Sequence, residues 1–244
     1  MIEGAILGAS IAGAGIAAVA IGYQSMSPTG QWFGKTFNSL SGEPRLLALT
    51  YDDGPNSRCT PRLLEVLAKN DVKATFFVIG RHVQQQPALA REIVAAGHVI
   101  GNHTFTHPKL IFTSKSQTKN ELQQCENALT QAVGTHSNLF RPPYGGRRPS
   151  TLRVARAMGL IPVMWGVTGW DWNAPPAAVI VEKVSKQIKG GDVIMLHDGG
   201  HSAPGADREQ TVKATDQLIS RYKSEGFEFV TIPEMMKRAS PAEG

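Results

Sequence analysis

Two pairs of residues in this chain of 244 residues have the types and spacing of a metal centre. Asp52 and Asp53 are adjacent carboxylates after an apolar run, and they repel each other unless a cation or a guanidinium offsets one charge. His103 and His107 are close enough in sequence for both imidazoles to reach one ion. Alone, the two aspartates also fit a turn, and the two histidines also fit a surface helix. Together they predict a catalytic site of two histidines and one carboxylate, with positions open for water and substrate.

Three further polar clusters follow or close predicted strands. They occupy residues 141–145 (Arg-Pro-Pro-Tyr-Gly), 171–172 (Asp-Trp) and 196–198 (Leu-His-Asp). Active sites of parallel-sheet folds form at the carboxyl ends of the strands. The three clusters are therefore expected to meet the aspartates and histidines at one edge of a sheet.

The elements that must position these residues alternate between two patterns. Short β-rich runs predict seven strands, at residues 46–51, 74–79, 98–102, 139–141, 161–165, 193–196 and 227–231. Between them lie amphipathic stretches with the three- and four-residue apolar spacing of one-faced helices, and Thr118 with Glu121 is a candidate capping box. The alternation predicts an α/β fold with parallel strands, either a barrel or an open doubly wound sheet.

The composition fits one globular catalytic domain. Apolar residues make up 41% of the chain, so neither a disordered chain nor a polytopic membrane protein is indicated. The net charge of +5 comes from scattered Lys and Arg residues, so no nucleic-acid partner is expected; an anionic polymer, anionic lipid or a plain solvated surface each fit it. Cys59 and Cys125 are expected to be buried free thiols, with a single bridge as the alternative.

The amino-terminal region divides the chain into three parts. Residues 4–22 carry no charged side chain, and this length is just enough to span a bilayer as one helix. Residues 1–22 are therefore predicted to be a transmembrane or signal-anchor helix, with a cleaved signal peptide as the alternative. Residues 23–44 are expected to be a linker that docks a few aromatic side chains. Residues 45–240 are expected to be the catalytic domain.

The five clusters, in this order, resemble the motifs of the polysaccharide deacetylase (NodB homology) domain of carbohydrate esterase family four. The match runs from Arg45 to Lys237, and its most specific motifs are Thr-Tyr-Asp-Asp-Gly-Pro, His-Thr-Phe-Thr-His and Arg-Pro-Pro-Tyr-Gly. The resemblance implies a distorted (β/α) barrel with fewer than eight regular units, which agrees with the seven strands counted above. It also implies a hydrolase acting on carbon–nitrogen bonds other than peptide bonds.

The resemblance also implies a role for each reacting residue. Asp53, His103 and His107 are expected to bind a divalent metal, for which zinc fits best and cobalt, nickel or manganese are alternatives. Asp52 is expected to be the base that takes a proton from the attacking water. His197 is expected to be the acid that protonates the leaving amine.

Other positions that match the family support these groups. Arg141 matches the residue that pairs with the base, and Asp171 matches the one that orients the acid histidine and raises its pKa. The backbone N–H of Tyr144 matches a donor to the developing oxyanion. The residues expected to contact substrate are Tyr144, Pro143, Trp172 and Met195.

Two positions depart from the family pattern. Thr168 stands where the family usually has an aspartate, which puts a secondary polar contact in doubt. Met195 stands in place of a leucine, and strand alternation puts it on the same face as His197. Met195 and Trp172 are therefore expected to wall an apolar pocket sized for an acetyl methyl group.

The remaining histidines and one charged pair lie outside these motifs. His82, His98 and His136 are expected on helix, strand-edge and loop surfaces. His201 follows two glycines near the active end of the barrel and is a candidate for substrate contact. The pair at 207–208, Asp-Arg, resembles a helix-opening element of the family and is expected to be structural.

The predicted function is the removal of N-acetyl groups from an amino-sugar polymer of the chitooligosaccharide or peptidoglycan type. The domain is expected to be membrane-anchored on the extracytoplasmic side, or secreted if the first segment is cleaved. Two alternatives stay open: an amide hydrolase for a non-sugar N-acyl substrate, and a non-catalytic, membrane-tethered glycan-binding module. Nothing in the sequence indicates an oligomeric state.

Overall fold

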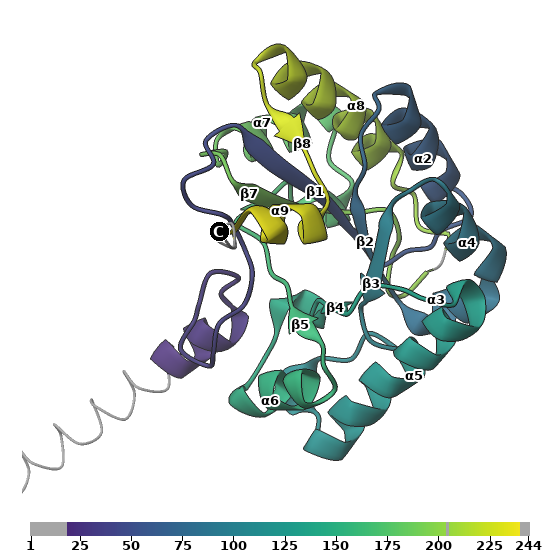
Figure 1. The fold of residues 1–244 in the computed structure, drawn as a ribbon, viewed down its shortest axis with the longest axis vertical. Helices are drawn as coiled ribbons and strands as arrows, with labels where there is room; N and C mark the ends of the chain where they lie inside the picture. Colours follow the sequence, from purple (N-terminus) through teal and green to yellow (C-terminus); the bar gives the residue numbers. More distant parts are fainter. Residues whose placement is uncertain (1–18, 204, 240–244) are drawn as a thin grey trace, which may run out of the picture.

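The computed structural model describes residues 19–203 and 205–239, which form one curled sheet with helices packed outside it (Figure 1). The strands are β1 (Leu46–Asp52), β2 (Thr75–Val78), β3 (Val99–Asn102), β4 (Leu139–Phe140), β5 (Ile161–Pro162), β6 (Val167–Thr168), β7 (Asp192–His197) and β8 (Glu228–Phe229). The α-helices are α2 (Thr60–Lys69), α3 (Gly80–Gln85), α4 (Pro87–Ala95), α5 (Lys115–Val133), α6 (Pro149–Ala157), α7 (Ala177–Ser185), α8 (Glu209–Ser224) and α9 (Ile232–Ala239). Three 3₁₀ helices are η1 (Leu110–Phe112), η2 (Pro143–Gly145) and η3 (Asp171–Asn173).

Seven of the strands form a continuous path in the order β5-β4-β3-β2-β1-β7-β6, and β8 pairs with the first two residues of β1. All of these strand pairs are parallel. No ladder joins β5 to β6 within the described residues, so the sheet is a curled half-barrel. The predicted α/β fold with about seven parallel strands is confirmed.

The number of strands differs from the prediction in one region. The pattern predicts one strand over residues 161–165, but the ladder with β4 ends at Pro162. Val163 instead bridges to Phe37. A further strand, β6, then forms at residues 167–168, and two residues are too few to show an alternating pattern.

The two faces of β1 carry different residues, as alternation along a strand requires. Leu47 and Leu49 belong to the apolar layer under the outer helices, whereas Leu46 and Ala48 belong to a separate cluster inside the curl. The same alternation places the side chain of Asp52 on the inner face at the carboxyl end of the strand.

Helix α9 fills the amino-terminal end of the curl. Its residues Ile232 and Met235 are completely buried beside Leu46 of β1 and Val193 of β7. Figure 1 shows this helix near the centre of the molecule, inside the ring of outer helices. Burying each such side chain stabilises the fold by about 1.5–3 kcal/mol. Polar groups can therefore gather only at the opposite, carboxyl end of the strands.

Residues 23–44, predicted to be a linker, run along this domain. Arg147 is buried and its guanidinium donates to the carbonyl oxygen of Gly30 at 2.6 Å. Phe37 forms a parallel bridge with Val163. The segment therefore packs against the region beside β5, at the open side of the half-barrel.

No helix within the described residues is long and apolar enough to cross a membrane. Residues 19–26 are helical. Most of the predicted membrane segment, residues 1–22, lies outside the part of the chain that the structure describes.

Candidate active site

A cavity of about 410 Å³ lies at the carboxyl ends of the strands. Its lining consists of Asp52, Asp53, His103, His107, Tyr144, Trp165, Trp172, Met195, His197, His201 and Arg208. Of the residues predicted for the site, only three are outside this lining. Arg141 and Asp171 are completely buried, and Pro143 lines a neighbouring hollow. The structure therefore brings the five sequence clusters to one place.

Asp53, His103 and His107 present three candidate ligand atoms within 4.8 Å of one another. The Nε2 atoms of His103 and His107 lie 3.5 and 3.2 Å from Asp53 Oδ1. This oxygen is buried and has no hydrogen-bond partner within the described residues. A buried carboxylate oxygen without a partner is costly. The three side chains therefore fit a divalent cation, and one carboxylate with two imidazoles is a donor set that zinc favours.

Hydrogen bonds from the backbone fix the two histidines. Nδ1–H of His103 donates to the carbonyl oxygen of Arg141 at 2.7 Å, which leaves Nε2 free to face the cavity. The backbone N–H of His107 donates to Thr104 Oγ1 at 3.1 Å. The ring of His103 is thus held with Nε2 toward the cavity, and the bond to Thr104 fixes the backbone of His107.

Glu121 of α5 holds the loop that joins these two histidines. Its carboxylate accepts hydrogen bonds from two backbone N–H groups of the loop, at 3.0 and 2.8 Å, and from the hydroxyl of Thr106 at 2.7 Å. The predicted capping box of Thr118 and Glu121 is wrong, because Ser114 and Gln117 cap α5. Helix α5 begins about one turn before the position that the apolar pattern predicts. Glu121 is therefore not a capping residue and is free to contact the loop.

The backbone at Asp53 is held in an uncommon conformation. Its φ of 71° lies in the left-handed region, and its carbonyl oxygen contacts His82 Nδ1 at 3.1 Å. Gly54 follows, and a Cβ at this position would lie 2.4 Å from Oδ2 of Asp198. Only glycine fits there, so the turn after β1 is built around this close approach.

The protonation of two candidate ligands, Asp53 and His107, suits metal binding. Burial raises the pKa of Asp53, but contacts with His103 and His201 and the charges of His107 and His197 bring it well below its usual value. Burial, with the neighbouring imidazoles, lowers the pKa of His107 to about 3. An ionised carboxylate beside a neutral imidazole is the form in which these groups bind a cation.

Arg141 holds the carboxylate of Asp52 from behind the cavity. Its Nη1 donates to Asp52 Oδ1 and to Thr50 Oγ1, both at 2.8 Å. The guanidinium is completely buried, 4.1 Å from the ring centroid of Phe77. The other oxygen of Asp52, Oδ2, lies 3.9 Å from Nε2 of His103. One oxygen is therefore tied to the guanidinium while the other faces the candidate metal ligands.

Asp171 orients His197 in the same way. Nδ1–H of His197 donates to Asp171 Oδ1 at 2.8 Å, and Oδ2 of Asp171 accepts from the backbone N–H of His197 at 2.8 Å. The hydroxyl of Thr211 donates to the same oxygen at 2.8 Å. Nε2 of His197 is thereby left on the cavity side.

These contacts change the pKa of His197. Burial lowers it, but the charge and hydrogen bond of Asp171, together with the charges of Asp53 and Asp52, raise the pKa to about 9. The pKa of Asp171 is lowered against burial by the same partner. His197 is therefore a cation at neutral pH, as a proton donor requires.

Left-handed backbone in non-glycine residues gathers at this cavity. Asp53, Thr104, His107 and Tyr144 have φ values of 71°, 67°, 63° and 57°. Such conformations cost free energy and persist at sites where the surrounding structure imposes them. Tyr144 also places its ring beside a candidate metal ligand, with its centroid 4.6 Å from that of His107.

Three apolar side chains wall the opposite part of the cavity. Met195 of β7, Trp165 and Trp172 all line it, and the ring of Trp172 meets His197 edge-on at 5.7 Å between centroids. Met195 lies on the inner face of β7 two residues before His197, as strand alternation predicts. These residues form an apolar wall beside the buried acid–base groups.

His201 and Arg208 complete the cavity. The ring of His201 stacks on that of His107 with centroids 4.7 Å apart, and its Nδ1 is 3.8 Å from Asp53 Oδ2. Arg208 donates to the carbonyl oxygens of Gly199 at 2.7 Å and Trp172 at 3.0 Å, so it joins the two loops on either side of His197. The sequence pattern alone did not place Arg208 in the lining.

Two expectations for residues outside the motifs are wrong. His82 and His98 were predicted at surfaces, but both are buried. His82 contacts the Asp53 carbonyl, and His98 Nδ1 accepts from the backbone N–H of Ala74 at 3.1 Å. Apolar spacing does not reveal that a histidine is buried when its partner is a distant backbone group. Both cysteines are free and buried, as predicted.

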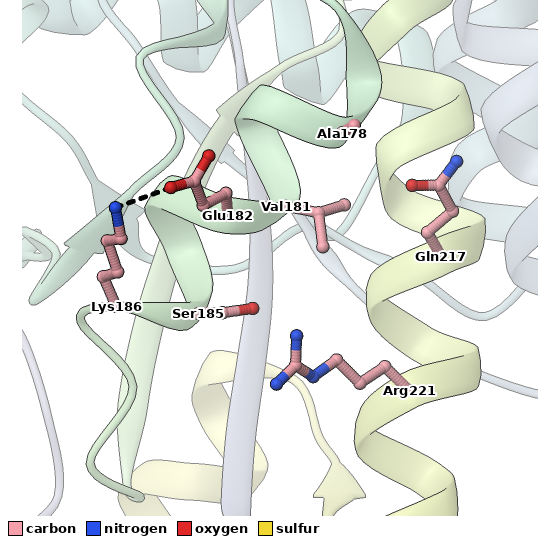
Figure 2. Close-up of a pocket in the computed structure, with 7 residues that line it drawn as sticks. All are labelled: Ala178, Val181, Glu182, Ser185, Lys186, Gln217 and Arg221. Atoms are coloured by element: carbon pink, nitrogen blue, oxygen red, sulfur yellow. Dashed lines mark hydrogen bonds and ion pairs between the residues drawn. The ribbon is translucent and has the colours of Figure 1, made fainter.

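Another hollow, of about 480 Å³, lies between α7 and α8 on the outside of the sheet (Figure 2). Its polar residues include Glu182 and Lys186, which form an ion pair at 2.6 Å, and Arg221. None of the sequence motifs contributes to it. Its charged groups behave as an ordinary solvated helix surface.

The chain was compared with known proteins. A family model described as polysaccharide deacetylase matches residues 40–163. A peptidoglycan-N-acetylglucosamine deacetylase of Bacillus cereus is 36% identical over 78% of this chain and 68% of the relative. A chitooligosaccharide deacetylase of a Bradyrhizobium species is 38% identical over 82% of this chain and 94% of the relative.

A solved structure shows the same similarity. It is a peptidoglycan N-acetylglucosamine deacetylase in complex with 4-naphthalen-1-yl-N-oxidanyl-benzamide, and it matches with a TM-score of 0.76 and 34% identity. The match covers 82% of this chain and 91% of that one. The chain therefore belongs to the polysaccharide deacetylase family, as its motifs predicted. With this family it is classed among the hydrolases of carbon–nitrogen bonds other than peptide bonds.

Proposed function

We propose that the chain removes N-acetyl groups from an amino-sugar polymer of the chitooligosaccharide or peptidoglycan type. One observation supports this most directly: a base paired with an arginine and an acid paired with an aspartate share a cavity with a candidate metal triad. Hydrolysis of an amide needs all three functions, because the carbonyl must be polarised, water activated and the amine protonated. The named relatives act on polymers of the same two types.

Asp53, His103 and His107 would hold the divalent cation, for which zinc is proposed. A cation bound there would supply a Lewis acid for the amide carbonyl and would lower the pKa of water. Asp52 accepts the proton of the attacking water through the oxygen that faces the triad. Arg141 holds this carboxylate in place through the hydrogen-bonded ion pair with Oδ1.

His197 donates the proton that the departing amine needs. Its Nε2 is the only ring nitrogen left for the substrate, because Nδ1–H is bound to Asp171. The backbone N–H of Tyr144 stabilises the developing negative charge on the carbonyl oxygen. The acyl methyl group packs against Met195 and Trp172, which line the same cavity.

The place of the domain in the cell is part of the proposal. We propose that residues 1–22 anchor the chain in a membrane with the catalytic domain on the extracytoplasmic side, where cell-wall polymers lie. Intact-mass measurement of the protein isolated from cells tests this. The anchor requires the full amino-terminal segment, whereas loss of the residues before Ile21 would show a cleaved signal peptide instead.

A substrate panel tests the proposed function. Acetate release is measured on chitooligosaccharides and peptidoglycan fragments, with N-acetylated small amines as the comparison. Turnover of the polymers is expected to be lost with a chelator and restored by zinc. Release from the small amines alone would replace the sugar substrate, and metal binding without any acetate release would indicate a glycan-binding protein.

A further inference from the structure

A second hollow, of about 500 Å³, adjoins the active-site cavity. This side groove is lined by residues that include Met26, Lys109, Ile111, Phe112, Pro143 and Tyr144. Tyr144 lines both hollows, so they lie on either side of one tyrosine. The volume is within the range of about 300–1,000 Å³ that ligand sites occupy.

Phe112 presents its ring to solvent in the side groove, with 79% of its surface exposed. The loop beneath it is fixed, because Leu110 is completely buried in a cluster with Phe140 and Arg148 donates to the carbonyl oxygen of Thr113. Met26 and Tyr144, which line the same groove, are exposed as well, so several apolar side chains meet solvent together here, as they do at contact sites. The ring therefore stands ready for a flat apolar partner.

Lys109 places a positive charge at the edge of the same groove. Its Nζ lies 5.7 Å from the ring centroid of Tyr144. Lys109 makes no salt bridge within the described part of the chain, where three lysines, Lys69, Lys186 and Lys213, have carboxylate partners. An acidic group in the groove would therefore find an uncompensated cation next to two aromatic rings.

We infer that the side groove binds the sugar unit next to the acetylated one, and that it favours a unit with a carboxylate substituent. This inference rests on the proposed function, because it requires a sugar polymer that runs from the active-site cavity past Tyr144 into the side groove. Sugar rings have C–H faces that pack on aromatic rings, and the rings of Phe112 and Tyr144 offer two such aromatic surfaces in the groove. The substituent then lies within reach of Lys109, which selects acidic polymers over neutral ones.

Two exposed side chains make the test. Phe112→Ala, Lys109→Gln and the matched control Lys186→Gln are compared with the unchanged protein. Each is assayed for acetate release on the single sugar N-acetylglucosamine, on fully N-acetylated chitotetraose and on a peptidoglycan-derived tetrasaccharide that carries carboxylates. Binding of both tetrasaccharides is measured by calorimetry in parallel, at low and high salt.

Phe112→Ala is expected to lower kcat/KM and affinity for both tetrasaccharides by roughly fivefold, because one aromatic contact is lost. Turnover of N-acetylglucosamine should be unchanged, because a single sugar in the cavity does not reach the groove. Lys109→Gln is expected to lower both values by roughly two- to fivefold for the acidic tetrasaccharide alone, and salt should reduce the difference. Lys186→Gln should match the unchanged protein throughout.

Equal values for Phe112→Ala and the unchanged protein on both tetrasaccharides would overturn the groove assignment. An equal loss on acidic and neutral substrates in Lys109→Gln would overturn the preference for carboxylates. If the unchanged protein released no acetate from any sugar, the proposed function would fall. The calorimetric difference at Phe112 would then still decide whether the groove binds sugar.

Discussion

Asp52 of β1 and His197 of β7 are direct partners in the register of two neighbouring parallel strands. Both lie at the carboxyl ends of their strands and both line the same cavity. Each is tied to one buried group of opposite charge at 2.8 Å, Arg141 for the aspartate and Asp171 for the histidine. The proposed base and acid thus stand side by side, and each is held by its own partner of opposite charge.

Replacing Arg141 should destabilise the fold as well as stop the reaction. Arg141→Met leaves Asp52 buried without its guanidinium, and breaking a buried pair in this way costs about 3–5 kcal/mol. Arg58→Met is a matched control, because its ion pair with Asp207 is exposed and contributes less than about 1 kcal/mol. Urea unfolding measures both. Equal midpoints for the two variants would argue against a buried structural role for Arg141.

Asp171→Asn should move the alkaline limb of the pH profile. A raised pKa keeps His197 protonated, so the donor is lost only as the pH rises through the folded value, about 9. Without the Asp171 charge, burial lowers the pKa, and activity should fall at lower pH than in the unchanged protein. Because a bound cation would lower this pKa in both proteins, kcat/KM is compared at one fixed metal concentration. An alkaline limb that stays in place would remove Asp171 from this role.

Met195→Ala should relax the choice of acyl group. Met195 and Trp172 both line the cavity, and in a tight apolar site an extra methylene costs about 1–3 kcal/mol. The unchanged protein is expected to prefer acetyl over propionyl and butyryl on the same sugar, and the variant to narrow that ratio. Leu129→Ala, in the outer core, controls for general loss of packing. Identical ratios in the unchanged protein and Met195→Ala would show that this side chain does not limit the pocket.

Glu121→Ala should weaken metal binding without touching a ligand. The carboxylate accepts three hydrogen bonds from the loop between His103 and His107, so its loss frees that loop to move. Groups that orient metal ligands typically affect affinity by about 10–100-fold. Gln123→Ala, on an exposed turn of the same helix, is the control. Competition against a zinc chelator measures the zinc affinity of both variants. Unchanged affinity in Glu121→Ala would show that the loop keeps its conformation without this carboxylate.

The sequence predicted the parts of the site that lie at strand ends. Alternation along β1 and β7 places Asp52, His197 and Met195 on the inner face, and the structure has them there. The alternation of β and α segments also predicted the parallel strands, whereas the choice of a barrel over an open sheet came from the family resemblance. Local patterns therefore suffice to place a site residue where one strand determines both the position of its side chain and the face on which it lies.

Other parts of the site depend on contacts between distant segments. Thr211 donates to Asp171 from 40 residues away, and His82 contacts the carbonyl of Asp53 across 29. Neither contact produces a periodic pattern in the sequence. The sequence therefore does not predict the contact of Thr211, and it predicts His82 at the surface. The position of Glu121 was mistaken for the same reason, because its partner is a loop and not its own helix end.

The measurement that tests the account most directly separates the two adjacent aspartates. Asp52→Ala and Asp53→Ala are purified in parallel, and the zinc content after gel filtration is determined together with acetate release from a chitooligosaccharide. Asp53 is the proposed ligand and Asp52 the proposed base. Asp52→Ala should keep its zinc and lose roughly 10²–10⁴ in rate, whereas Asp53→Ala should be both zinc-depleted and nearly inactive. A reversed pattern of zinc content, or two variants that keep both zinc and activity, would contradict the roles assigned to this site.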